Sequence, residues 1–297
     1  MTKFSNIRNY AKLSVAPMMD WTDRHCRYFH RTLSKNTLLY TEMVTSPALI
    51  KGNATHLLEF DKSEHPVALQ LGGSDPIELA KAAVIGSKYG YDEINLNVGC
   101  PSDRVQSGSF GAVLMKTPEV VAKCCKEMID AVDTEVTVKC RVGVDQQKPD
   151  ETLPKFLEQI SNAGVTRVII HARKAVLSGL SPKQNRNIPP LNYELVYKMK
   201  ELFPDLHISL NGGIQSIWHA KSHLENGIDG VMIGRAAYQK PGEVLIDVDK
   251  YIFNDETSEV TEKDVVKKMI PYIENQYKDG GKVSKITRHM LGLFSGK

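Results

Sequence analysis

Short apolar segments alternate with longer amphipathic segments along most of the chain. The short segments are rich in branched apolar residues and span residues 13–18, 38–43, 67–72, 93–99, 136–143, 167–172, 207–213 and 230–235. Several are almost continuously apolar, which is typical of strands buried on both faces of a sheet. Because strands that alternate with helices form βαβ units, the pattern predicts eight strands in a parallel sheet.

Amphipathic helices are predicted between these strands. Apolar residues recur at helical spacing in residues 76–89, 118–132, 151–163, 193–203 and 217–225. Asp75-Pro76 and Thr117-Pro118 each place a capping residue before a proline, as at many helix starts. Eight such units in about 240 residues match the size of a (β/α)8 TIM barrel. An open doubly wound sheet is the alternative, but its G-x-G-x-x-G motif does not follow the first strand.

The character of the chain changes after residue 240. Residues 255–262 are polar and acidic, which indicates an exposed link. Residues 262–278 and 283–294 are predicted to form two helices, and we expect Pro271 to kink or interrupt the first of them. We therefore divide the chain into a barrel domain of residues 1–240 and a small helical domain of residues 241–297.

The composition of the chain restricts the class of protein but does not indicate a function. The 297 residues are 41% hydrophobic and 25% charged, which is the composition of a soluble globular protein. Because we find no apolar run of about 18 residues and no apolar leader, we expect a cytoplasmic protein without a membrane partner. The net charge of +3 permits a nucleic-acid partner without indicating one. The five cysteines lack zinc-finger spacing, so free thiols and no metal site are expected.

Polar residues gather at the carboxyl ends of the predicted strands, where barrels carry their active sites. Side-chain alternation places Thr137, Lys139 and Arg141 on one face of the fifth strand. It likewise places Asn95 and Asn97 on one face of the fourth strand. If these faces point inward, cations and amides meet at the barrel mouth, where a buried cation is costly without an anionic partner.

Two interpretations of these cations remain open. An ion pair between Lys139 and a loop carboxylate such as Glu42 would neutralise the charge, and an anionic ligand in the mouth would do the same. Glycines in residues 211–214 and 233–236 follow the last two strands, from which barrels often bind phosphate. Such glycines let backbone N–H groups approach a phosphate. Because tight turns also need glycine, a plain turn remains the alternative.

Cys100 is the most informative thiol, because its loop follows the fourth strand at the predicted mouth. A cysteine in this position can act as an acid, a base or a nucleophile, and the alternative is an inert, half-buried thiol. The other cysteines are expected to be small buried apolar residues: Cys26, Cys124, Cys125 and Cys140. His171 ends the sixth strand, where a ligand contact is expected.

Two motifs together resemble the tRNA-dihydrouridine synthase family. Residues 14–23 (SVAPMMDWTD) resemble its first-strand motif, and residues 93–102 (EINLNVGCPS) resemble its catalytic-loop motif. Further matches follow in the same order at residues 68–72, 138–139, 171–173, 211–214 and 234–238. Residues 22–28, 180–190 and 286–294 resemble the bacterial class that modifies nucleotides 20 and 20a of the D-loop.

The resemblance implies FMN over the barrel mouth and NADPH as the reductant. The residues implied to bind FMN are Pro17, Met18, Met19, Gln70, Lys139, His171, Asn211, Gly212, Gly213, Gly234 and Arg235. The first three pack on the isoalloxazine, the next three contact its polar edge, and the remainder hold the phosphate. An ammonium beside N1 stabilises anionic reduced flavin, which is one way that proteins tune this cofactor.

The implied activity is that of a flavin-dependent oxidoreductase that reduces uridine to 5,6-dihydrouridine in the D-loop of tRNA. Hydride passes from N5 of FMN to C6 of uracil, and Cys100 donates a proton to C5. The uridine must leave its stack to reach the mouth. The residues implied to contact the uridine or the tRNA are Asn97, Arg104, Arg141, Lys174, Lys183, Gln184, Arg186 and Asn187. Basic residues of the C-terminal helices are expected to add salt-dependent phosphate contacts.

One departure from the family concerns the C-terminus. In the family the chain runs on past residues 291–294 into another basic helical stretch, so we expect a truncated tRNA-binding domain. No protein partner is implied. Three other functions stay open: an FMN barrel that reduces a free pyrimidine, a Schiff-base aldolase that uses Lys139 and a substrate phosphate, and a non-catalytic RNA-binding barrel.

Overall fold

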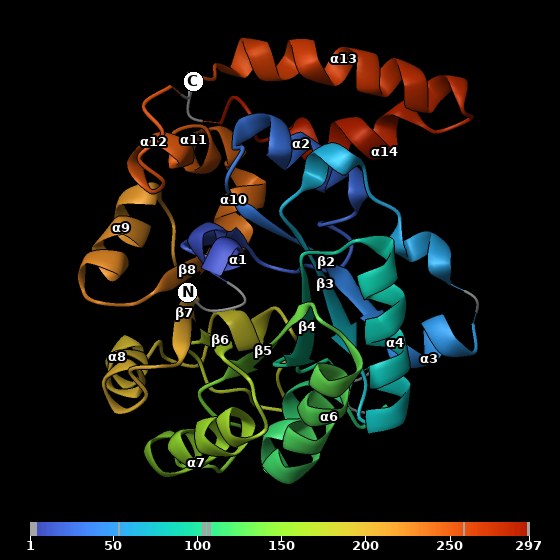
Figure 1. Cartoon of the computed structure of the whole chain (residues 1–297). Coiled ribbons are helices and arrows are strands. Elements are labelled where there is room, and N and C mark those ends of the chain that lie inside the picture. The colour runs from blue at the N-terminus through green and yellow to red at the C-terminus, as the bar shows by residue number, and fades with distance from the viewer. Residues whose placement is uncertain (1–4, 53, 103–104, 106–107, 258, 296–297) are drawn as a thin grey trace.

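Eight parallel strands close into a barrel in sequence order, and the last strand pairs with the first. The computed structural model describes residues 5–52, 54–102, 105, 108–257 and 259–295. The strands are β1 (Leu13–Val15), β2 (Leu38–Thr45), β3 (Val67–Gly72), β4 (Glu93–Val98), β5 (Glu135–Arg141), β6 (Arg167–His171), β7 (His207–Asn211) and β8 (Gly230–Ile233). The predicted barrel and its eight strands are confirmed (Figure 1).

Helices surround the strands. They are α2 (Arg24–Leu33), α4 (Pro76–Tyr89), α6 (Pro118–Ala131), α7 (Pro149–Asn162), α8 (Tyr193–Leu202), α9 (Ile217–Glu225) and α10 (Arg235–Gln239). The five helices predicted between strands are confirmed as α4 and α6 to α9, with small differences at their ends. Additional short segments are α1 (Ser5–Tyr10), α3 (Ser46–Ile50), η1 (Thr55–Leu58), η2 (Lys62–Glu64), η3 (Gly111–Lys116) and η4 (Gln184–Arg186). No helix in the described part of the chain has the length and hydropathy of a membrane span.

Hydrogen bonds between strands that are not neighbours identify the side chains inside the barrel. Arg167 on β6 donates to Glu93 on β4, and Tyr40 on β2 donates to the same carboxylate at 2.6 Å. Lys139 on β5 donates to Asn211 on β7 at 3.0 Å. Because side chains alternate along a strand, every second residue of these strands also faces inward.

The amino end of the barrel is closed by the segment that begins with α1. Ile7 and Ala11 form one buried apolar cluster with Leu38, Tyr40 and Ile169. The larger apolar core lies between the strands and the surrounding helices. The polar inward positions near the carboxyl ends of the strands therefore form the open mouth.

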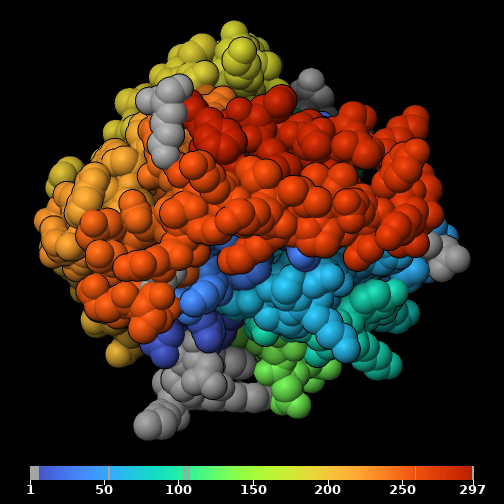
Figure 2. Space-filling model, turned by 90° about the horizontal axis from the view of Figure 1, so that it is seen from above, coloured from blue at the N-terminus to red at the C-terminus, as the bar shows by residue number. Residues whose placement is uncertain are grey.

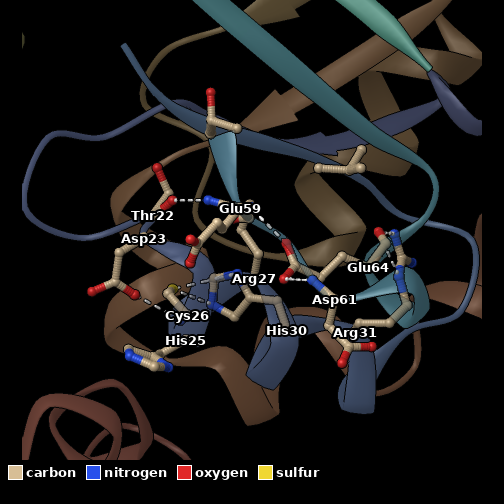
Figure 3. A network of polar contacts seen from close by, with 12 residues as sticks. Thr22, Asp23, His25, Cys26, Arg27, His30, Arg31, Glu59, Asp61 and Glu64 are labelled. Atoms are coloured by element: carbon tan, nitrogen blue, oxygen red, sulfur yellow. Dashed lines mark hydrogen bonds and ion pairs between the residues drawn. The ribbon is translucent and has the colours of Figure 1, made fainter. Parts of the chain in front are cut away.

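The loop that follows β1 is fixed by α2 (Figure 3). Arg27 forms a buried ion pair with Glu64, with 2.6 Å between Nε and Oε2. The same guanidinium donates to the backbone oxygen of Thr22 at 2.9 Å and to that of Glu59 at 3.2 Å. A buried ion pair with satisfied hydrogen bonds fixes geometry more than it adds stability. Thr22 in turn bonds to Met18 at the barrel mouth.

The chain beyond the barrel units folds back across α2. Its helices are α11 (Pro241–Leu245), α12 (Val248–Tyr251), α13 (Glu262–Lys278), α14 (Val283–Thr287) and the 3-10 turn η5 (Arg288–Met290). Tyr272 of α13 stacks on Tyr28 of α2 with ring centroids 3.8 Å apart, and its hydroxyl lies 2.7 Å from His25 Nδ1. Figure 2 shows this orange and red segment lying across the blue N-terminal part of the chain.

The helix bounds in this segment differ from the prediction. The first helix is not interrupted at Pro271, which lies inside α13. The helix predicted over residues 283–294 is wrong, because α14 ends at Thr287 and a 3-10 turn follows. A Cβ atom at Gly292 would lie 2.2 Å from the backbone oxygen of Gln239, so the chain here passes directly against the end of α10.

Asp23 connects α2 to the C-terminal segment. Its carboxylate caps α2 by accepting from the backbone N–H of Cys26 at 3.0 Å, and it accepts from Arg288 at 2.8 Å. The buried ring of His289 lies 3.0 Å from the same carboxylate. Burial alone would raise the pKa of Asp23, but the bonds from His289, Cys26 and Arg288 outweigh it and hold the pKa below the ordinary value.

We expect Asp23→Ala to lower the free energy of unfolding by about 2 kcal/mol, through the lost cap and the lost charged hydrogen bonds. Because the folded protein lowers the pKa of Asp23, its contribution is present above the ordinary pKa of 3.8 and is lost as the pH falls further. Urea titrations at neutral and acid pH measure this difference between wild type and variant.

Asp75→Ala is the matched control. Asp75 caps α4 by accepting from the N–H of Glu78 and has no hydrogen bond to the C-terminal segment among the described residues, so its loss is expected to cost about 1 kcal/mol. Equal costs for the two variants would show that the bonds from Arg288 and His289 do not stabilise the fold.

Candidate active site

Five residues predicted at the barrel mouth lie together on the inward faces of consecutive strands. Asn97 donates from Nδ2 to Gln70 Oε1 at 2.8 Å, and Lys139 Nζ donates to Asn211 Oδ1 at 3.0 Å. Asn97 is the register partner of Lys139, and His171 is the register partner of Asn211. The sequence prediction therefore placed an ammonium, an imidazole and three amides correctly at one rim.

Lys139 is a partly buried cation, and no acidic partner for it is found among the described residues. Its ammonium donates a hydrogen bond to the Asn211 amide, and it makes no ion pair with Glu42 in the described structure. Burial lowers the pKa of Lys139 from 10.5 to about 8, and the charge of Arg141 adds to this effect. The ion-pair interpretation is therefore not supported, and an anion bound beside Lys139 would offset the cost of burying it.

His171 presents an unsatisfied polar atom. Its Nδ1 is buried and has no hydrogen-bond partner among the described residues. Burial holds the pKa of His171 well below its ordinary value, and the charges of Arg141 and Lys139 lower it further. The imidazole is therefore neutral at physiological pH. A buried nitrogen without a partner is rare in folded proteins and is consistent with a bond to a ligand.

The glycine turn after β7 has a backbone that other residues rarely adopt. Gly212 has φ of +115° and Gly213 has φ of +72°. A Cβ atom at Gly213 would lie 2.5 Å from Leu191 Cδ1 and 2.8 Å from the Tyr193 hydroxyl oxygen. The same hydroxyl donates to the carbonyl of Gly212 at 2.7 Å. Both glycines are therefore required by the conformation and packing of the turn, and α8 supports it from behind.

The second glycine turn follows β8 and begins α10 with Gly234 and Arg235. A Cβ atom at Gly234 would lie 3.8 Å from Met18 Sδ, so this turn adjoins the loop after β1. In that loop Pro17 and Met18 are partly buried, and Met19 is 53% exposed. The first-strand loop and the two turns thus border one part of the mouth.

Cys100 lies in a turn that is fixed by Asn97. The backbone N–H groups of Gly99 and Cys100 donate to Asn97 Oδ1 at 3.1 and 3.0 Å, and the carbonyl of Cys100 accepts from Ala112 at 2.9 Å. Its thiol lies 3.5 Å from the Ser102 hydroxyl. All five cysteines are described, and Cys100 is the one that is not buried. The expected buried state of the other four is confirmed.

Arg141 joins the loops around the thiol. Its Nε donates to the carbonyl of Gly99 at 2.9 Å, and Nη1 donates to the carbonyls of Lys174 and Asn185 at 3.3 and 3.1 Å. Burial lowers the pKa of Arg141 to about 10, and the neighbouring Cys100 raises it again in part. Cys100 therefore lies at the same end of the barrel as the inward-facing cations.

The remaining residues predicted to contact tRNA lie around the loop after β6. Lys183, Gln184, Arg186 and Asn187 are exposed on this loop, whereas Lys174 is partly buried and donates to the Gln147 carbonyl at 3.4 Å. Arg235 donates to the carbonyl of Arg186 at 3.2 Å, which connects this loop to the glycine turn after β8. Arg104 lies outside the described residues.

Several supporting residues were not among the predicted site residues. They are Glu93, Asn95, Thr137, Asn185, Leu191 and Tyr193. Strand alternation had already placed Asn95 and Thr137 on the faces of Asn97 and Lys139, and it could have indicated Glu93 in the same way. The others lie in loops or at a helix start, where periodicity carries no such signal. Among the described residues, no three potential metal-ligating side chains are grouped closely enough to hold a metal ion.

Comparison with known proteins agrees with this architecture. The family model for "Dihydrouridine synthase (Dus)" matches residues 14–297. The tRNA-dihydrouridine(20/20a) synthase of Escherichia coli strain K12 is 55% identical over 297 residues, which is 100% of this chain and 85% of that protein. The synthase of the same name from Shewanella oneidensis is 53% identical over 283 residues, covering 95% of this chain and 84% of that protein. The chain therefore belongs to the dihydrouridine synthase family of oxidoreductases.

Proposed function

We propose that the protein reduces uridine to 5,6-dihydrouridine at positions 20 and 20a in the D-loop of tRNA, with FMN as cofactor and NADPH as reductant. The names of its relatives support the positions. The observation that carries the chemistry is Lys139, a partly buried ammonium that donates to an amide at the same rim as the partly exposed Cys100.

The mouth has the donors that FMN requires. Lys139 would stabilise negative charge at the flavin edge, and the unsatisfied Nδ1 of His171 and the Gln70 amide would bond to polar ring atoms. The backbone N–H groups of the two glycine turns, at Gly212–Gly213 and at Gly234, would donate to the phosphate. When bound, the cofactor supplies the hydride that reduces C6 of the uracil ring.

Cys100 would donate the proton to C5 of the uracil. Its thiol is accessible, and its turn is held by the Asn97 side chain. Asn97 Oδ1 already accepts from two backbone N–H groups, so a further contact with uracil would use the second hydrogen of Nδ2. The uridine would have to unstack to reach this rim, at a cost of a few kcal/mol.

Binding of tRNA would rest on basic residues around the mouth and on residues 241–297, which we propose as the tRNA-binding domain. Lys183 and Arg186 are exposed on the loop after β6. Arg141 donates to backbone carbonyls within the protein, so we propose that it contributes mainly through its charge. Contacts with phosphate make affinity fall with salt.

The lowered pKa of Lys139 would also suit a Schiff-base nucleophile, which needs an uncharged amine. That reaction is not the chemistry of the family to which the chain belongs. Burial and the charge of Arg141 lower this pKa, and we propose that an anionic cofactor beside Lys139 offsets their effect.

A comparison of FMN with riboflavin, which lacks the phosphate, tests the cofactor assignment. The purified protein is expected to absorb near ~450 nm as a property of bound flavin. After removal of the cofactor, FMN should bind at least about a hundredfold more tightly than riboflavin, because several charged hydrogen bonds reach the phosphate. Equal affinities, or turnover by a protein without flavin, would contradict the proposal.

A further inference from the structure

A line of hydrogen bonds begins at the Cys100 turn and runs down the inside of the barrel. The backbone N–H groups of Gly99 and Cys100 donate to Asn97 Oδ1. Asn97 Nδ2 donates to Gln70 Oε1 at 2.8 Å. Gln70 Nε2 then donates to Asn95 Oδ1, also at 2.8 Å. Each side-chain amide thus accepts from the residue nearer the mouth and donates to the residue below it.

The line ends at a buried carboxylate. Asn95 Nδ2 donates to Thr137 Oγ1 at 2.7 Å, and the Thr137 hydroxyl donates to Glu93. Glu93 also accepts from Tyr40 and from Arg167. Asn95, Thr137 and Glu93 are each 0% exposed, so water cannot replace a lost partner in this half of the line.

The groups at both ends of the line require that its hydrogen bonds run in one direction, with each donor nearer the mouth than its acceptor. A carboxylate accepts hydrogen bonds but donates none, so the single hydroxyl hydrogen of Thr137 must point to Glu93. Thr137 can then only accept from Asn95, which turns the oxygen of Asn95 toward Gln70 and that of Gln70 toward Asn97. At the mouth, the backbone N–H groups can only donate, and they need the oxygen of Asn97. A reversed amide anywhere in the line would set donor against donor.

We propose that Glu93 and Thr137 are positioning residues that fix the orientation of the Gln70 and Asn97 amides and thereby the Cys100 turn. This inference rests on the function proposed above for Cys100. Neither residue reaches the thiol directly, and their effect passes through the intervening amides. This line of hydrogen bonds has one stable arrangement, because each side chain in it is buried or nearly buried and each of its polar groups needs a hydrogen-bond partner.

Thr137→Val tests the proposal, because valine keeps the shape of threonine but cannot bond to Asn95 or Glu93. The rate constant kcat on tRNA is expected to fall about tenfold, with KM changed less than about twofold, as for loss of one buried charged hydrogen bond. Alkylation of the purified protein by iodoacetamide should accelerate at least about threefold at Cys100, since the other thiols are buried.

Two further variants distinguish the effect of the Thr137 hydroxyl from the effect of changed packing in the barrel. Thr137→Ser restores the hydroxyl and is expected to recover kcat and the alkylation rate to within about twofold of wild type. Ser209→Ala removes another buried barrel hydroxyl, which is 1% exposed and has no partner among the described residues. It should leave both measurements unchanged.

Each outcome decides the proposal. Unchanged kcat and unchanged alkylation in Thr137→Val would overturn it, and so would a loss that serine does not restore or that Ser209→Ala reproduces. If the alkylation rates respond as expected but Cys100→Ala keeps full turnover, the line positions the turn and the acid role of Cys100 is wrong. The two ideas therefore fail separately.

Discussion

Cys100→Ala is expected to lower dihydrouridine formation by about 10²–10⁴-fold, the usual contribution of a positioned general acid. Cofactor binding and bleaching of the flavin absorption by NADPH should remain as in the wild type. The turn is held by backbone bonds to Asn97 and Ala112, which do not involve the thiol. Rapid-mixing absorption measurements follow the NADPH reaction, and nucleoside analysis of the tRNA follows the product.

Cys124→Ala is the control for loss of a thiol. Cys124 is buried in α6, and its Sγ donates to the backbone carbonyl of Ser74. This variant should keep turnover within about twofold of wild type, with at most a modest loss of stability. Full turnover in Cys100→Ala would remove the proposed acid, and loss of NADPH reactivity would mean that the thiol supports the cofactor instead.

Lys139→Met is expected to have opposite effects on stability and function. FMN binding and turnover should be lost, because the methionine cannot interact with an anionic flavin edge. The cofactor-free protein should nevertheless unfold at a temperature roughly 2–4 °C higher at neutral pH, a gain of about 1–2 kcal/mol. The gain arises from removing a buried ammonium, and it is reduced by the lost bond to Asn211.

The pH dependence distinguishes this explanation from better packing of methionine. Lys139 has a pKa of about 8 in the folded protein and an ordinary pKa of 10.5. The stability of the wild-type protein therefore falls as the pH is lowered from 10.5 through 8, where Lys139 becomes charged in the folded state. The lost stability is restored as the pH rises toward 10.5. The advantage of Lys139→Met over wild type should shrink across this range in calorimetry of the cofactor-free proteins.

Lys126→Met serves as the control for this variant. Lys126 pairs with Asp130 on the exposed surface of α6 and is 56% exposed, so its replacement should change neither unfolding nor cofactor binding. An unchanged unfolding temperature together with wild-type FMN affinity in Lys139→Met would show that Lys139 does not act at the mouth.

The barrel could be predicted because the burial of a strand determines how apolar its own residues are. Strands covered on both faces are rich in apolar residues, and the mainly apolar β1, β3 and β8 are buried along their whole length. The end of the second C-terminal helix could not be predicted in this way. α14 ends at Thr287, and beyond it Gly292 passes directly against Gln239, a contact between distant residues that has no local pattern.

The site could be predicted in part for the same reason. Alternation on β5 correctly brought Lys139 to the interior, and the barrel rule placed Cys100 at the same end. The support of the Gly212 turn by Tyr193 was not predictable, because α8 and β7 meet there only in the folded chain. The direction of the amides at Gln70 and Asn97 depends on the strand register and on a carboxylate several bonds away.

Mass analysis of tRNA after reaction tests the central claim most directly. The purified protein is incubated with NADPH and with tRNA that lacks dihydrouridine, and the fragment containing nucleotides 20 and 20a is isolated. The account predicts that this fragment gains the mass of two hydrogen atoms for each uridine reduced, and that Cys100→Ala greatly slows the gain. An unchanged fragment from a flavin-loaded wild-type protein that consumes NADPH would contradict it.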